Sequence, residues 1–316
     1  MQKKGLLVLS LVICMLFVAC GRESEAPGND QKQMRLAVAT MPSIDKIPLI
    51  IGIEKGYFAA HGLDVIHQNF QSPGDRDAAL ASGNLDGVMT DMVALALYLE
   101  AGMEWKITSL VQTGFAVLAS PGSGIQRLSD IDPQNVYGIS LNGLIEYIAD
   151  RAGNAEKIML PSVSGRVEQL LSNKIDLTVV PEPYGLMAVQ NGAAMIATGA
   201  DLGIYAAVMI FSDVAINNKS DAISAFYAGY QDSLHYLQTA DPDDYIDLVI
   251  EKGDFAAEIG DVLRGMVFDS LQMPREEQYT AIIDWMLQNE ELSGNYDFAF
   301  ADIVDYSFFE ARTVQG

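Results

Sequence analysis

Cysteine is nearly absent from this chain of 316 residues, because its two cysteines, Cys14 and Cys20, both lie within the first twenty positions. The rest of the chain therefore cannot form a disulfide framework, a cysteine-ligated zinc or iron–sulfur site, or a thiol nucleophile. Basic residues are also scarce, with 19 lysines and arginines against 42 acids and a net charge of −23. No basic cluster could hold a phosphate backbone, so nucleic acid is excluded as a partner.

The motifs of common enzymes are missing as well. No GxxxxGK[ST], GxGxxG, GxSxG or HExxH pattern occurs, so phosphate-binding loops, nucleophile elbows and zincin sites are not indicated. The three histidines, His61, His67 and His235, are scattered along the chain. The sequence therefore predicts no catalytic residue, no metal and no cofactor, and it favours a binding protein over an enzyme.

The first 33 residues read as a targeting segment. Lys3 and Lys4 precede an apolar run over residues 6–19, which is too short for a membrane span of ~20 residues but suits a secretory signal. The run ends in Ala19-Cys20-Gly21 and resembles a bacterial lipoprotein signal. We expect a signal peptide over 1–19, a lipid on Cys20 and a flexible tether over 20–33. The alternative is an ordinary signal peptide with an incidental cysteine.

The remainder alternates short apolar strands with helices. Strands are predicted at 36–39, 63–66 and 85–90, with helices at 48–60, 75–82 and 92–100 between and after them. A similar rhythm returns with strands at 136–140 and 175–180 and helices at 143–152 and 165–172. Helical spacing then dominates at 221–238, 242–251 and 276–289. Strands separated by helices of about ten residues predict βαβ units and largely parallel sheets.

This pattern predicts an α/β fold of two lobes, each a mainly parallel sheet flanked by helices. Lobe one would comprise 34–115 plus 212–316, and lobe two 116–211, with the chain crossing between them at 114–119 and 206–211. A cleft would lie between the lobes, lined by the carboxyl ends of both sets of strands. Ligands of open α/β sheets bind at such edges.

Several motifs carry a family resemblance. Glu54-Lys55-Gly56-Tyr57-Phe58, followed by Gly62-Leu63-Asp64-Val65, resembles the opening of type II periplasmic substrate-binding proteins of the nitrate, sulfonate and thiamine-precursor family. The segments 76–86, 128–131 and 174–183 are similar to later parts of that family. The resemblance implies a non-enzymatic, extracytoplasmic protein that closes on a small molecule and delivers it to an ABC permease and its ATPase. We expect it to act as a monomer in the cell envelope, anchored by lipid.

Ten residues in loops that follow strands are the candidates for ligand contact: Ser43, Asp45, Arg76, Thr90, Asp91, Thr113, Asn142, Arg166, Glu182 and Tyr184. Ser43, Asp45 and Asn142 are equally explained as helix caps, and the two arginines as solvated helix residues. Asp91 and Glu182 are the stronger candidates, because each follows an apolar strand where packing gives no reason for a carboxylate. Tyr184 is placed to stack on a flat ligand.

The ligand class stays open between three readings. The carboxylates and Tyr184 favour a neutral or cationic heterocycle, which within the family implies a thiamine-type pyrimidine precursor. The alternative is a sulfonate or nitrate anion bound by Arg76, Arg166 and helix N-termini. An enzyme of pyrimidine or menaquinone biosynthesis on the same fold is a third possibility. The lack of cysteine after Cys20 and the lipoprotein signal argue against this third reading.

Overall fold

The computed structural model describes residues 33–308. The predicted signal peptide, Cys20 and all of the predicted tether except Gln33 lie outside the described residues. From Gln33 onward the chain forms one compact unit. Within the described part, no helix is both long enough and apolar enough to cross a membrane.

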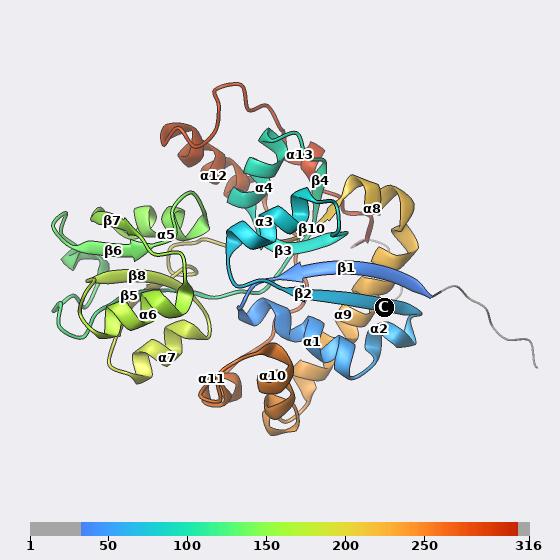
Figure 1. The fold of residues 1–316 in the computed structure, drawn as a ribbon, viewed down its shortest axis with the longest axis horizontal. Coiled ribbons are helices and arrows are strands. Elements are labelled where there is room, and N and C mark those ends of the chain that lie inside the picture. Colours follow the sequence, from blue (N-terminus) through green and yellow to red (C-terminus); the bar gives the residue numbers. More distant parts are fainter. Residues whose placement is uncertain (1–32, 309–316) are drawn as a thin grey trace, which may run out of the picture. The chain divides into compact units, whose positions relative to one another are not determined.

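The first sheet contains β1 (Met34–Thr40), β2 (Leu63–Asn69), β3 (Gly87–Asp91), β4 (Trp105–Leu110) and β10 (Ala207–Ser212), in the order β2-β1-β3-β10-β4 (Figure 1). β1 pairs in parallel with both β2 and β3, whereas β10 is antiparallel to both of its neighbours. The other four strands therefore all run in one direction.

The second sheet repeats this topology. It contains β5 (Phe115–Ala119), β6 (Val136–Ile139), β7 (Glu156–Met159), β8 (Leu177–Pro181) and β9 (Ala194–Thr198), in the order β7-β6-β8-β5-β9. β6 pairs in parallel with β7 and β8, and β5 is antiparallel to β8 and β9. The prediction of two mainly parallel sheets is confirmed.

The predicted crossings at 114–119 and 206–211 are wrong, because the strands β5 and β10 occupy those positions. β4 ends at the carboxyl edge of the first sheet, so the chain enters the second sheet at its carboxyl edge and β5 runs antiparallel there. β9 and β10 make the same arrangement in the reverse direction. The two crossings are therefore 111–114 and 199–206. Residue 115, predicted in lobe one, belongs to the second sheet, and residues 207–211, predicted in lobe two, belong to the first sheet. The lobe division as a whole stays a prediction.

Helices cover both faces of the first sheet. On one face lie α1 (Ile47–Glu54), α2 (Tyr57–Ala60), α9 (Ser220–Thr239), α10 (Ile246–Gly253) and α11 (Ile259–Arg264); on the other lie α3 (Pro73–Ala81), α4 (Met92–Glu100), α12 (Glu276–Gln288) and α13 (Phe300–Ile303). The short α8 (Asp213–Asn218) follows β10. The helix predicted over 48–60 is two helices, because Gly56 between them adopts φ +77°.

The second sheet packs α5 (Leu144–Ala152) on one face and α6 (Val163–Leu171) with α7 (Tyr184–Gln190) on the other. Short 3₁₀ turns lie at Ile44–Lys46, Leu128–Asp130 and Pro242–Asp244. Side chains alternate along β5, where Val117 and Ala119 face α5 while Ala116 and Leu118 face α6 and α7.

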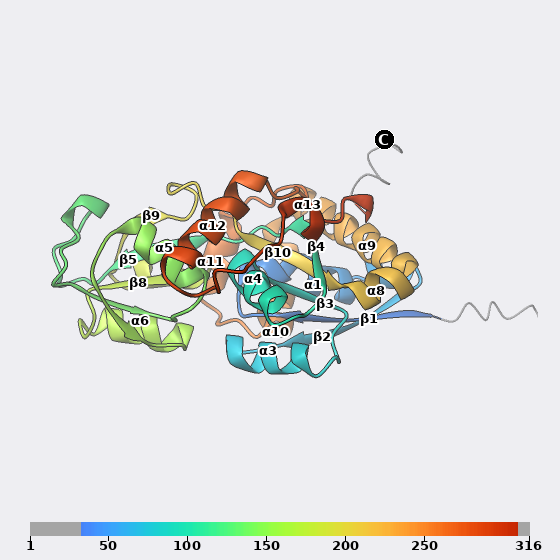
Figure 2. The same ribbon diagram turned by 90° about the horizontal axis from the view of Figure 1, so that it is seen from above.

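One apolar cluster continues from the first sheet to the second through α4, α5 and α12. The rings of Tyr147 on α5 and Trp285 on α12 meet edge to face with centroids 5.3 Å apart. Trp285 Nε1 also donates to Asp150 Oδ2 at 3.0 Å. Figure 2 shows α12 beside α4 and α5. This contact joins the parts of the chain that carry the two sheets.

Candidate functional site

A cavity of about 110 Å³ lies between the carboxyl ends of the two sheets, and we call it the polar cavity. The structure brings seven of the ten predicted site residues to its wall: Ser43, Asp45, Arg76, Thr90, Asp91, Thr113 and Arg166. They come from the segments after β1 and β4, from the last two residues of β3, and from the first turns of α3 and α6. That they contact a ligand stays a prediction.

Three helices begin at this cavity. Pro73, Asp91 and Val163 line it and stand at the first turn or N-cap of α3, α4 and α6. Each helix is nine residues long. The positive ends of their dipoles therefore point at one small volume, which favours a negatively charged group there.

The two arginines of the cavity are buried, so the alternative of solvated helix residues is wrong. Arg76 is 5% exposed and its Nε donates to Asp77 Oδ1 at 2.9 Å. Asp91 is close enough for its charge to interact with that of Arg76, and burial raises the pKa of Asp91 against this attraction. The charge of Arg76 is thus balanced by neighbouring acids.

Arg166 has no such balance. It is 2% exposed, and its Nη1 donates to the backbone oxygens of Leu160 and Pro161 at 2.9 and 3.1 Å. Its Nε has no hydrogen-bond partner, and within residues 33–308 no carboxylate pairs with it. Burial lowers the pKa of Arg166 to about 10, so the guanidinium stays charged at neutral pH. A buried, unpaired cation is costly unless an anion completes it.

Asp45 and Thr90 add two further unsatisfied atoms. Asp45 is 8% exposed, and neither its Oδ1 nor the Oγ1 of Thr90 has a hydrogen-bond partner among the described residues. Burial raises the pKa of Asp45 to about 6, although the charge of Lys46 opposes the shift. Neither Ser43 nor Asp45 caps a helix through its side chain. Asp45 Oδ1 and Thr90 Oγ1 are therefore available to a ligand, whereas Ser43 Oγ lies 3.2 Å from Thr113 Oγ1.

Comparison with known proteins gives the family. The model of the family described as "NMT1/THI5 like" matches residues 43–244, well over half of the chain. The chain belongs to the NMT1/THI5-like family. The matched range includes every predicted ligand-contact residue, from Ser43 to Tyr184.

Relatives and solved structures agree with this family. The putative ABC transporter periplasmic binding protein of Brachyspira hyodysenteriae is 23% identical over 270 residues, which cover 77% of this chain and 76% of the relative. The bicarbonate-binding protein CmpA of Synechococcus elongatus is 31% identical over 117 residues, 35% of this chain and 25% of CmpA. The structure of the periplasmic aliphatic sulphonate binding protein SsuA from Escherichia coli matches with a TM-score of 0.72 at 12% identity, covering 85% of this chain and 97% of SsuA. The predicted two-lobed fold is confirmed.

Three predicted site residues of this NMT1/THI5-like chain do not line the polar cavity. Asn142 is exposed, and its backbone N–H donates to Glu146 Oε2 at 2.8 Å. Glu182 accepts from the backbone N–H of Leu186 at 3.0 Å, next to Gly185, where a Cβ would come within 2.8 Å of Glu182 Oε1. Tyr184 packs with the cluster of α6 and α7. The expectation that packing gives Glu182 no role was wrong, because its carboxylate binds a backbone N–H in the first turn of α7.

Asp91 also has a structural role, since its Oδ1 accepts from the N–H of Ala94 at 2.9 Å as the N-cap of α4. Unlike Glu182, it lines the cavity as well. Ser140 was not among the ten candidates, although it begins the same loop as Asn142, and it lines the cavity directly after β6. Asp91 ends β3 and Ser140 directly follows β6, so both stand at the carboxyl end of a strand, whereas Asn142 lies two residues farther along.

Proposed function

We propose that this chain is the solute-binding component of an ABC importer and that it captures a small oxyanion which also carries a hydrogen-bond donor. Arg166 is the observation that carries the ligand class, because a buried guanidinium without a carboxylate requires an anion as its partner. The converging N-termini of α3, α4 and α6 act in the same direction.

The donor is inferred from Asp45. Its unpartnered Oδ1 accepts a hydrogen bond when the carboxyl is ionised, so the ligand must present an O–H or N–H on that side. The volume sets the size: since a cavity of about 150 Å³ takes benzene, the 110 Å³ here holds a molecule of about four heavy atoms. Bicarbonate has this size, two acceptor oxygens and one hydroxyl. CmpA is a bicarbonate-binding relative, and SsuA shares the fold and binds sulphonates.

The structure supports a thiamine-type pyrimidine less than the sequence pattern does. Two of the residues that favoured such a heterocycle, Glu182 and Tyr184, do not line the polar cavity. The remaining acids, Asp45 and Asp91, line the cavity together with two buried arginines and interact with the charge of Arg76. The cavity is also smaller than a substituted pyrimidine requires.

The mechanism is capture by closure. The segment after β1 already contacts the segment after β8, because the Ile44 N–H donates to Glu182 O at 3.2 Å. It also contacts the first crossing, where Ser43 Oγ lies 3.2 Å from Thr113 Oγ1. A ligand held by Asp45 on one side and Arg166 on the other favours this closed arrangement over an open one. The closed protein then delivers its ligand to a permease driven by an ATPase and itself catalyses nothing.

We place the protein outside the cytoplasm, in the cell envelope, as a monomer tethered by a lipid on Cys20. The basis is the lipoprotein-like segment of the sequence and the periplasmic location that the relative's name gives. Metabolic labelling with a fatty-acid analogue tests the anchor. Cys20→Ser should abolish the label, whereas Cys14→Ser should leave it if cleavage precedes Cys20.

The ligand proposal is tested by calorimetric titration of the full-length chain with bicarbonate, nitrate, methanesulfonate and a thiamine-precursor pyrimidine. Bicarbonate and nitrate match in size, but only bicarbonate has a donor, so we expect bicarbonate to bind about tenfold more tightly. Arg166→Gln should weaken bicarbonate binding at least about a hundredfold. The matched control is Arg127→Gln, because Arg127 is an exposed arginine that lies outside the cavity.

Two results would overturn the proposal. Binding of the pyrimidine without any oxyanion binding would return the ligand to the heterocycle class. Unchanged bicarbonate affinity in Arg166→Gln would remove the polar cavity as the site.

A further inference from the structure

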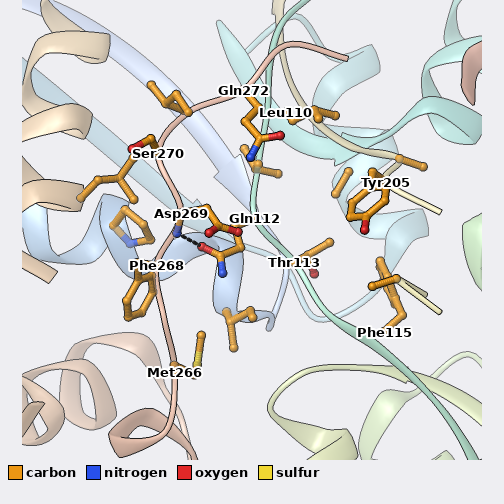
Figure 3. A pocket seen from close by; sticks show the side chains of 18 of the residues that line it. Leu110, Gln112, Thr113, Phe115, Tyr205, Met266, Phe268, Asp269, Ser270 and Gln272 are labelled. Carbon is orange, nitrogen blue, oxygen red and sulfur yellow. Dashed lines mark hydrogen bonds between the residues drawn. The ribbon is translucent and has the colours of Figure 1, made fainter. Parts of the chain in front are cut away.

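A second and larger cavity of about 340 Å³ lies at the two crossings (Figure 3). Its walls come from residues 110–113, where β4 passes into the first crossing, from 204–207, where the second crossing passes into β10, and from the segment 266–272 between α11 and α12. We call it the hinge cavity and name 266–272 the strap. By the same comparison with benzene it has room for about a dozen heavy atoms.

The strap is tied to the first crossing by hydrogen bonds. Leu110 N–H donates to Gln272 O at 2.8 Å. The side-chain amide of Gln112 donates to Val267 O and accepts from the N–H of Asp269, both at 2.7 Å. Figure 3 shows this side chain reaching from the crossing to the strap. Gln112 therefore holds the walls of the cavity together, and its amide is not free for a ligand.

Four aromatic side chains stand among the mostly aliphatic residues that line the hinge cavity, and one charged side chain lines it as well. Phe115, Tyr205, Tyr230 and Phe268 all line the cavity, and Tyr205 is 47% exposed. No lysine or arginine is among the lining residues, whereas the polar cavity contains two arginines. The one lining carboxylate is Asp269, which is exposed and forms no ion pair within the described residues.

We propose that the hinge cavity is a second ligand site, which takes a molecule with one aromatic ring and a neutral or cationic polar group. The aromatic walls provide stacking and edge contacts for a ring, and Asp269 provides a partner for an ammonium or amide N–H. An anion is disfavoured because no basic side chain compensates Asp269. This site differs in chemistry from the polar cavity, and its existence does not depend on which solute the polar cavity binds.

Occupancy of the hinge cavity is coupled to closure. Thr113, Phe115 and Ala207 line both cavities, so the first crossing and the start of β10 separate the two sites. An occupant that touches both crossings and the strap favours the arrangement in which the polar cavity is also formed. The coupling is therefore positive and reciprocal: each ligand tightens the binding of the other.

The test uses 2-phenylethylamine as the probe and phenylacetate as its anionic counterpart, each titrated into the full-length chain by NMR. The amine should bind, and phenylacetate should bind at least tenfold more weakly. Asp269→Asn should reduce that discrimination to about twofold or less. Tyr205→Ala should weaken amine binding at least fivefold. Matched controls are Asp302→Asn and Tyr306→Ala, since both side chains are exposed and lie outside the cavity.

Amine binding that survives both Asp269→Asn and Tyr205→Ala would place the probe elsewhere and overturn the site. So would the absence of amine binding at millimolar concentration, or equal binding of amine and phenylacetate. Competition decides the relation between the sites. Bicarbonate should raise the affinity for the amine. An unchanged affinity would contradict the coupling, and displacement of the amine by bicarbonate would show one shared site. Failure of bicarbonate to bind bears only on the proposed oxyanion function, because the variants of the hinge cavity are judged with the amine alone.

Discussion

Two regions lie between the parts of the chain that carry the two sheets, and they differ in whether their polar groups have hydrogen-bond partners. At the contact between α5 and α12, the indole N–H of Trp285 is satisfied by Asp150, and Asp150 also pairs with Lys157 at 2.6 Å. In the polar cavity, Asp45 Oδ1, Thr90 Oγ1 and Arg166 Nε have no partner among the described residues. The first region is mostly complete without a ligand, and the second is not.

This difference indicates that the α5–α12 contact contributes to stability and that the polar cavity contributes to ligand binding. Buried polar groups in folded proteins are normally hydrogen-bonded, so a cluster of three unpartnered atoms around one cavity is a cost that the rest of the fold offsets. The α5–α12 contact contributes stability by apolar burial and a satisfied hydrogen bond. Substitutions at the α5–α12 contact should therefore change mainly the free energy of unfolding, whereas substitutions in the polar cavity should change mainly the ligand affinity.

The largest effect on stability is expected at Trp285. Trp285→Ala removes the indole from the core, its edge-to-face contact with Tyr147 and its bond to Asp150, and should lower the free energy of unfolding by about 3 kcal/mol. Urea unfolding at neutral pH measures it.

Trp285→Phe is the matched variant, because it keeps an aromatic ring against Tyr147 and loses only the donor to Asp150. Its cost should be about 1 kcal/mol. Equal losses in both variants would mean that the hydrogen bond, rather than ring packing, dominates this contact.

A smaller effect of opposite sign is expected at Asp45. Burial raises the pKa of Asp45 to about 6 in the folded protein, above its ordinary value of 3.8. Ionisation of this buried group therefore opposes folding as the pH rises, from about 4 to above 6. Asp45→Asn should raise the unfolding free energy by about 1–2 kcal/mol at pH 8, with no gain below pH 4. The same variant should lose the preference for bicarbonate over nitrate.

Asp302→Asn is the control for Asp45→Asn, since Asp302 is exposed and its substitution should leave the pH profile of stability unchanged. A destabilised Asp45→Asn at pH 8 would contradict the view that Asp45 is retained for binding.

Much of the fold could be predicted because local signals are strong. The helix expected over 92–100 has those bounds in α4, since an apolar run follows a residue, Asp91, that caps it. The error at β5 and β10 has a physical origin. A short apolar segment has the same pattern whether it crosses between sheets or enters one, and the partner strands that decide between the two are distant in the sequence.

The sequence pattern could predict which residues stand at the carboxyl ends of strands, but not which way their side chains point. Thr90 and Asp91 end β3 and line the polar cavity. Asp91 and Glu182 look alike in the sequence, because each carboxylate follows an apolar run and precedes a helix. Only the structure shows that the Glu182 carboxylate packs beside Gly185 and accepts a hydrogen bond from the N–H of Leu186 in α7. That no carboxylate among residues 33–308 pairs with Arg166 likewise becomes visible only in the folded chain.

The smallest predicted effect is expected at Glu291, which follows α12 and whose Oε2 is buried without a hydrogen-bond partner among the described residues. Burial and the charges of Glu146 and Asp150 raise the pKa of Glu291 to about 7, while Lys157 opposes the shift. Because this pKa lies above its ordinary value of 4.5, the contribution of Glu291 to stability is present at low pH and is lost as the pH rises through 7. Glu291→Gln should be more stable than the parent by about 0.5 kcal/mol at pH 8, since solvent screens this half-buried group, and equal to it at pH 4. Urea unfolding at both pH values measures this, with Glu290→Gln, an exposed neighbour, as the control. A gain of equal size at pH 4 and pH 8 would show that shape rather than charge limits the contact, and the two regions would then differ less than proposed.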